Sequence, residues 1–307
     1  MSSNLQFRIF LLGVVLGFSV DARADPEPIG ADMTAQGGAT LAADESNAAI
    51  ATNPGLLSLN RRYDFNAQFG VGPSGGLHWA AGGMDAKTSE VVSFGFLYAG
   101  DRYEPPLTTP ELPGWWEVGS EIPNMKRQHD FIAAVGAPIV RDRLAVGVGG
   151  HVTLFNNDRT GKGTTGNVDV GLGFKAHEYV TVGLSGNNLL PFDPLSDRPL
   201  TAGGGVRVHG PVAAIEVDGG YLDARGSGPP AFVAAGAELA PRSARLRAGY
   251  RLEGPARQSI LTAGLGVFSE GGALEYGVEI PVGGGWGSLA HVVGVRFGAP
   301  PGISPPE

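Results

Sequence analysis

The chain has 307 residues, including 50 Gly and 23 Pro but no Cys, and its formal charge is −8 with a pI near 5.3. The acidic balance argues against a nucleic-acid partner, which calls for a basic patch, and the missing Cys excludes disulfides and thiolate metal sites. With 42% apolar and 17% charged residues the chain is not disordered, and so much glycine disfavours long helices and favours a β-rich fold.

Residues 1–24 have the pattern of a secretory signal peptide. Arg8 gives a positive start, residues 9–18 are apolar, and Ala22-Arg23-Ala24 offers a small-x-small cleavage site. The alternative, an N-terminal membrane anchor, needs about 20 apolar residues. No later stretch is long and apolar enough for a spanning helix. The exported chain is therefore predicted to be either a secreted soluble protein or a membrane-crossing β-barrel.

Residues 25–60 are distinct from the remainder and too few for a domain. Residues 34–40 are small and flexible in composition. Asp44 to Ala51 is predicted to form a short helix with an acidic first turn, which Asn53-Pro54-Gly55 ends. We expect this segment to pack inside the rest of the chain as a plug.

From residue 61 to residue 298, apolar and polar residues alternate with the period of two that is typical of strands. Fourteen strands are expected, at about 61–71, 75–84, 90–101, 125–137, 142–155, 164–176, 178–187, 199–209, 211–222, 231–240, 243–253, 257–269, 272–282 and 287–298. Longer links alternate with tight ones, which indicates an all-β, closed antiparallel transmembrane barrel. A β-sandwich or solenoid is the alternative. A Pro-rich tail, residues 299–307, follows.

The two faces of the expected strands differ in chemistry. The apolar face carries aromatic residues, namely Phe65, Phe69, Phe94, Phe96, Tyr98, Phe131, Phe174, Tyr250, Tyr276 and Phe297. The opposite face carries charges that are too costly in lipid and should pair inside a lumen: Asp169, Lys175, Arg207, Glu216, Asp218, Glu238, Arg245, Arg247, Arg251, Glu275, Glu279 and Arg296. Glycines on this face are expected to leave room for the plug, namely Gly147, Gly149, Gly171, Gly173, Gly183, Gly249 and Gly277.

Motifs for catalysis or metal binding are weak. Residues 70–75 fit G-x-G-x-x-G, but they lie in a Gly-Pro turn between two strands, where a hairpin is expected. Residues 161–163 are predicted to be a loop tip. The six His residues are scattered without metal-ligand spacing, although His151 and His209 fall on the lumen face. We therefore expect no enzyme activity, no metal and no cofactor.

Two groups of residues are candidates for ligand binding. Trp115 and Trp116 lie in the longest predicted loop, where they would capture an apolar ligand or anchor the loop at the headgroup zone of the outer-membrane lipid. Arg245, Arg247 and Arg251 would bind an anionic group. Alternatively, these arginines pair with Glu238, Glu275, Glu279 or acids of the plug, because unpaired charge in a lumen is costly.

The chain resembles the FadL-type and PorV-like outer-membrane barrels. The residues that carry the resemblance are Gly37-Gly38-Ala39, the stretch through Asp44, Asn53-Pro54-Gly55, and the strand residues 182–189, 274–277 and 291–297. The resemblance implies fourteen strands around an N-terminal hatch, with Asp44, Asn53, Pro54 and Gly55 as hatch or gate residues. Gly55 stands where Ala is usual, and the loops are shorter than those of the FadL transporters.

The resemblance also implies a location in the outer membrane of a Gram-negative cell and an interaction with the barrel-insertion machinery as a partner. The function expected first is passive uptake of small hydrophobic molecules of the fatty-acid kind, which would land near Trp115 and Trp116 and pass as the Asn53-Pro54-Gly55 turn shifts. The alternative is a PorV-like scaffold or docking barrel for secretion partners.

Overall fold

The computed structural model describes residues 30–44, 46–72, 76–103, 126–157, 161–190, 200–223, 229–241, 243–254, 258–269, 271–283 and 289–298. The predicted signal peptide, the loop with both tryptophans and the predicted tail lie outside these residues. No helix in the described part is long and apolar enough to cross a membrane.

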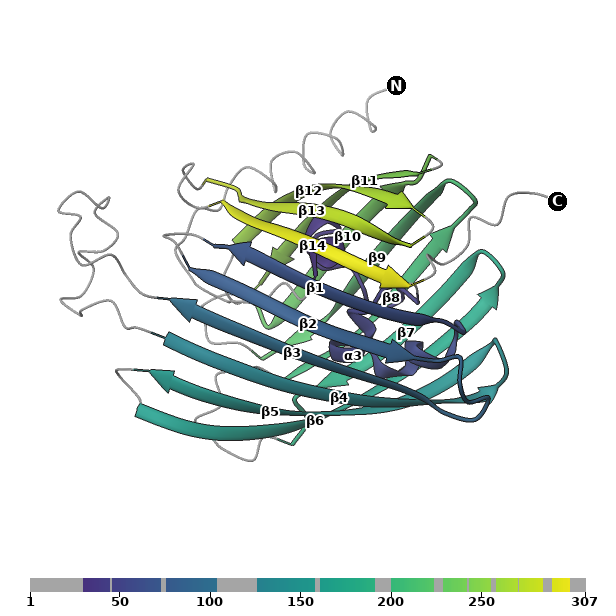
Figure 1. Ribbon diagram of the computed structural model, residues 1–307, viewed down its shortest axis with the longest axis horizontal. Coiled ribbons are helices and arrows are strands. Elements are labelled where there is room, and N and C mark those ends of the chain that lie inside the picture. The colour runs from purple at the N-terminus through teal and green to yellow at the C-terminus, as the bar shows by residue number, and fades with distance from the viewer. Residues whose placement is uncertain are drawn as a thin grey trace, which may run out of the picture.

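Fourteen antiparallel strands form a closed barrel, as the alternating pattern predicted (Figure 1). They are β1 (Tyr63–Val71), β2 (Leu77–Asp85), β3 (Ser93–Tyr103), β4 (Lys126–Val140), β5 (Leu144–Asn157), β6 (Gly161–His177), β7 (Val180–Asn187), β8 (Thr201–His209), β9 (Ala213–Leu222), β10 (Ala231–Leu239), β11 (Ala244–Glu253), β12 (Gln258–Ser269), β13 (Gly272–Pro281) and β14 (Ala290–Gly298). Each strand pairs with its sequence neighbours, and β1 pairs with β14, where Phe65 lies opposite Phe297. Closure leaves no free sheet edge in the ring.

The links alternate between two rims because consecutive strands run in opposite directions. We call the rim with residues 104–125, 191–199 and 224–228 the long-link rim, and the other the short-link rim. One hairpin of the long-link rim differs from the prediction. Lys162 and Gly163 belong to β6 and pair with Asn156 and Phe155, so the predicted loop tip at 161–163 is wrong. Pairing continues there because β4 also reaches this level, where its Lys126 pairs with Asn157 of β5, and Asn157 pairs in turn with Gly161 of β6.

The faces of the strands agree with the predicted parity. Outward phenylalanines expose at least 41% of their surface, namely Phe65, Phe69, Phe94, Phe96, Phe131, Phe174 and Phe297. The inward charges predicted from the sequence are buried, apart from the partly exposed Lys175. An apolar outer face around a charged interior is the arrangement that a barrel needs to stand in lipid.

Short helices precede the barrel. They are α2 (Ala31–Ala35), α3 (Ala49–Thr52) and the 3₁₀ helix η1 (Pro54–Ser58). The predicted helix from Asp44 is therefore wrong over its first half, and helix begins only at Ala49. The reason is that the side chain of Asp44 binds Lys175 of β6, at 3.0 Å between Oδ2 and Nζ, and does not cap a helix.

Candidate functional site

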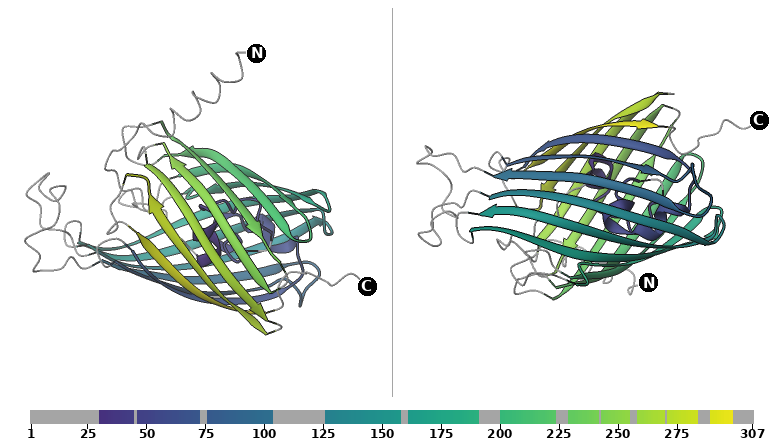
Figure 2. Two further views of the ribbon diagram at one scale, coloured as in Figure 1. Left: turned by 90° about the horizontal axis from the view of Figure 1, so that it is seen from above. Right: turned by 60° about the horizontal axis from the view of Figure 1, so that its bottom comes forward.

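Residues 30–60, which we call the hatch segment, lie inside the ring of strands (Figure 2). Helix α2 packs against β11–β14, whereas α3 and η1 pack against β3–β7. The segment therefore crosses the lumen from one wall to the other. Its described part places the sequence-predicted hatch residues Asp44, Asn53, Pro54 and Gly55 in the interior. Their action as a gate stays a prediction.

Glycines of the wall let the hatch segment approach the strands. A Cβ atom on Gly147 would lie 2.3 Å from the carbonyl carbon of Pro54, and one on Gly183 would lie 1.7 Å from the carbonyl oxygen of Leu41. The same holds for four more of the predicted lumen glycines, namely Gly171, Gly173, Gly249 and Gly277. Gly149 is the exception, since a Cβ there would meet only the side chain of Asp169 and a backbone oxygen of β4. These six glycines therefore lie where the wall contacts the plug.

The Asn53-Pro54-Gly55 turn is fixed by hydrogen bonds of a buried amide. Asn53 Nδ2 donates to Leu41 O at 2.7 Å and to Leu172 O of β6 at 3.2 Å. Its Oδ1 accepts from Gly55 N at 3.2 Å. A Cβ on Gly55 would lie 2.6 Å from the backbone of Leu172, which explains why glycine stands there in this chain.

Two carboxylates of β9 hold the backbone of the hatch segment. Asp218 Oδ2 accepts from Thr40 N at 2.7 Å and from Leu41 N at 2.8 Å, and Glu216 Oε1 accepts from Ala42 N at 2.8 Å. The sequence placed both acids on the lumen face but gave no sign of these partners. Every residue but Pro offers a backbone amide, so partners of this kind leave no trace in a sequence.

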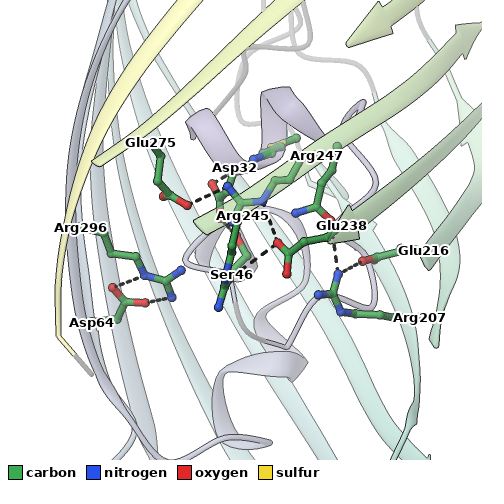
Figure 3. Close-up of polar contacts among 12 residues, drawn as sticks. Asp32, Ser46, Asp64, Arg207, Glu216, Glu238, Arg245, Arg247, Glu275 and Arg296 are labelled. Carbon is green, nitrogen blue, oxygen red and sulfur yellow. Dashed lines mark hydrogen bonds and ion pairs between the residues drawn. The ribbon is translucent and has the colours of Figure 1, made fainter. Parts of the chain in front are cut away.

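The predicted arginine ladder is paired with lumen acids (Figure 3). Arg247 lies 2.8 Å from both Glu238 and Glu275, and Arg245 lies 3.7 Å from Glu238. Arg251 pairs with Glu253 at 2.7 Å and with Glu279 at 3.3 Å.

These ion pairs correspond to the structural alternative drawn from the sequence. Binding of an anionic ligand by Arg245, Arg247 and Arg251 stays a prediction. Figure 3 also shows Arg207 next to Glu216, at 3.2 Å, and Arg296 bonded to Asp64. Charges of both signs therefore alternate around this part of the wall, which keeps the desolvated charges compensated.

Asp32 ties the hatch segment to this network. Ser46 Oγ donates to Asp32 Oδ2 at 2.7 Å, which joins two parts of the segment. Burial alone would raise the pKa of Asp32, but the charges of Arg247 and Arg296 and the hydrogen bond from Ser46 outweigh it and hold the pKa below its usual value. The carboxylate therefore remains charged at neutral pH and is attracted to these arginines of the wall.

The opposite wall is apolar. Ile50, Leu56, Leu57 and Leu59 of the hatch segment are fully buried. They form one cluster with inward residues of β2–β5, namely Ala80, Met84, Leu97, Ala99, Ile132, Ala134 and Ala145, together with Ala86 of the β2–β3 link and Ala49 of α3. The hatch segment is thus held by hydrogen bonds and ion pairs toward β6–β14 and mainly by apolar packing toward β2–β5.

The closed fourteen-stranded barrel with a buried N-terminal segment defines the class of fold, that of the FadL-type barrels. The toluene transporter TbuX of Ralstonia pickettii aligns over 89% of this chain and 99% of its own, with 12% identity and a TM-score of 0.62. The toluene transporter TodX of Pseudomonas putida aligns over 89% and 98%, with 13% identity and a TM-score of 0.59. CymD, a monoaromatic hydrocarbon channel, aligns over 89% and 97%, with 11% identity and a TM-score of 0.57. No family model and no curated protein match the chain.

Proposed function

We propose that this protein is a barrel of the bacterial outer membrane that lets small hydrophobic molecules diffuse through its lumen after the hatch segment moves. The long-link rim faces the cell exterior, as in other outer-membrane barrels. The names of the structural neighbours, toluene transporters and a monoaromatic hydrocarbon channel, favour small apolar cargo. Cargo of the fatty-acid kind remains part of the same proposal.

The observation that carries the proposal is the unequal attachment of the hatch segment. Toward β6–β14 it is held by directional bonds, such as those of Asp218 and Asn53. Toward β2–β5 it is held chiefly by the apolar cluster around Ile50 and Leu57. Apolar contacts have no fixed direction, so an apolar molecule can replace them at little cost. The path therefore opens along β2–β5, while α2 stays attached to the wall as the fixed end.

A pair of engineered disulfides, one on the apolar side and one at the fixed end, tests this mechanism. The chain has no native Cys that could interfere with them. Ser58 Oγ lies 3.0 Å from Ser93 Oγ of β3, so S58C/S93C would lock the segment on the apolar side. A Cβ on Gly294 of β14 would lie 3.5 Å from Ala31 Cβ, so A31C/G294C would lock the fixed end as a matched control.

The measurement is uptake of labelled toluene by cells that carry each oxidised variant in the outer membrane. We expect at least a tenfold loss for S58C/S93C, recovery with reductant, and no change for A31C/G294C. Uptake that survives complete cross-linking of S58C/S93C would contradict passage along β2–β5. Uptake that does not depend on the barrel at all would contradict transport.

A scaffold or docking role is the second candidate, which the paired lumen charges favour because they hold α2 firmly. Two results together would favour this role: secretion proteins that co-purify in stoichiometric amounts, and toluene uptake that is the same with and without the barrel. The barrel-insertion machinery is expected as a partner under either function. We assign no catalytic role to any residue.

A further inference from the structure

A patch of polar side chains lies on the inner wall between the hatch segment and the long-link rim. His151 and Thr153 of β5 point inward, directly opposite Asn167 and Thr165 of β6. Cβ atoms of residues that face each other in this way are about 5 Å apart, so the four side chains form one surface. We call these four residues the wall patch. All four are more than nine-tenths buried.

Most polar atoms of the wall patch have no hydrogen-bond partner among the residues that the structure describes. These atoms are both amide atoms of Asn167, Oγ1 of Thr165 and Nε2 of His151. Thr153 is different, because its hydroxyl donates to Asp130 of β4. Buried polar groups are normally paired, and a cluster of unpaired ones is a place where a ligand with matching groups gains affinity.

The position of the wall patch suits a ligand on its way to the hatch segment. Gly147 and Gly171, which touch the Asn53-Pro54-Gly55 turn, lie on the same two strands. His151 and Asn167 are each four residues further toward the long-link rim, which is about 13 Å along a strand. The patch also borders the apolar cluster, which ends at β5. A molecule there would touch apolar and polar wall together.

The acidic residues around the wall patch favour a neutral ligand over an anionic one. Asp169 lies 3.3 Å from Nδ1 of His151, and Asp130 lies opposite Thr153. Among the inward side chains that the structure describes on β4–β6, the one lysine or arginine is Lys175, at the short-link end and bound to Asp44. The carboxylate of Asp169 beside the patch disfavours a second carboxylate there. The amide and the hydroxyl of the patch offer both donors and acceptors, which a hydroxyl group matches.

We propose that the wall patch is a binding site for the hydroxyl group of small neutral molecules, such as aromatic alcohols and phenols, and that it widens the cargo beyond pure hydrocarbons. This inference rests on the proposed transport function. Asn167, Thr165 and His151 bind the hydroxyl, while the apolar wall of β2–β5 receives the hydrocarbon body. A carboxylate of similar size gains nothing from the patch.

The test compares benzyl alcohol, toluene and benzoate as probes in uptake by cells that express the full-length chain. Toluene and benzyl alcohol have similar shapes but differ by the hydroxyl group. T165V and N167L should each lower the uptake of benzyl alcohol relative to toluene about tenfold, and leave toluene itself unchanged. The matched control is T181V, because Thr181 is a similarly buried inward threonine at the short-link end of β7, and its hydroxyl likewise has no partner in the described part of the chain.

The outcomes separate the inference from the function on which it rests. If toluene uptake needs the barrel but T165V and N167L leave the ratio of benzyl alcohol to toluene unchanged, the wall patch is not a hydroxyl site. Benzoate uptake that exceeds benzyl alcohol uptake would likewise overturn it. If neither probe needs the barrel, transport itself fails. T165V replaces the hydroxyl with a methyl group of similar size, so its ratio of benzyl alcohol to toluene uptake decides the question even if N167L does not fold. Heat-modifiable gel mobility verifies that each variant forms a folded barrel.

Discussion

Replacing Asn53 with Ala should loosen the hatch segment without weakening the barrel. The substitution removes three hydrogen bonds, to Leu41 O, Leu172 O and Gly55 N, and leaves these groups buried without that partner. At about 0.5–1.5 kcal/mol for each bond, the loss is about 3 kcal/mol. Because about 1.4 kcal/mol corresponds to a factor of ten, the displaced state of the segment should become about 100-fold more populated. Apart from the bond to Leu172 O of β6, the side chain of Asn53 bonds only the hatch segment, so the strand-to-strand hydrogen bonds of the barrel should keep their stability.

Thiol labelling measures that population directly, since the native chain has no Cys. A49C in α3 is the reporter, because Ala49 is 1% exposed and reacts only when the segment opens. We expect A49C to be labelled about 100-fold faster when N53A is also present. N66A is the matched control, because Asn66 lies on the wall strand β1 and its Oδ1 has no partner in the described residues. An acceleration below about threefold, or one that N66A matches, would refute the assignment of Asn53 as the central bond of the segment.

Three further predictions concern the contacts of the hatch segment. G147V should displace the segment because its Cβ would lie 2.3 Å from the backbone of Pro54, and single-channel recordings should show larger conductance while the barrel stays heat-modifiable. D218A should free two backbone amides and speed A49C labelling about tenfold, whereas D218N, whose oxygen still accepts, should have a smaller effect. Despite burial, the charges of Arg247 and Arg296 hold the pKa of Asp32 below its usual value, so its contribution to the stability of the hatch segment is complete at neutral pH and is lost only as the pH falls below the ordinary range of an aspartate. Hydrogen exchange of α2, corrected for intrinsic rates, should accelerate only in that acidic range.

The barrel could be predicted from the sequence because its physical requirements act residue by residue. Lipid on one side and a polar lumen on the other impose alternation in every strand, and Phe94, Phe96 and Arg247 follow it. Glycines such as Gly183 marked the places where the plug touches the wall. Periodicity and glycine placement are local signals, so the fourteen strands and the faces of their side chains agree with the prediction.

The partners of the lumen groups could not be predicted in the same way, because they depend on register and on the path of the hatch segment. Arg247 meets Glu238 across one strand pair and Glu275 two strands away. Asp218 binds backbone amides that any sequence would offer. The helix predicted from Asp44 fails for the same reason, since the tertiary partner Lys175 takes the carboxylate that local sequence assigns to a helix start.

The division of the lumen into a polar and an apolar arc links the two proposals. A plug held equally on all sides would have to break its whole interface to move, whereas this one can yield along β2–β5 and stay tied through Asp218 and Glu216. The wall patch around Asn167 lies on β5 and β6, where one arc meets the other. A molecule with an apolar body and one hydroxyl group fits that boundary better than a hydrocarbon or an anion does. The arrangement of the wall therefore selects both the side on which the plug opens and the chemistry of what passes.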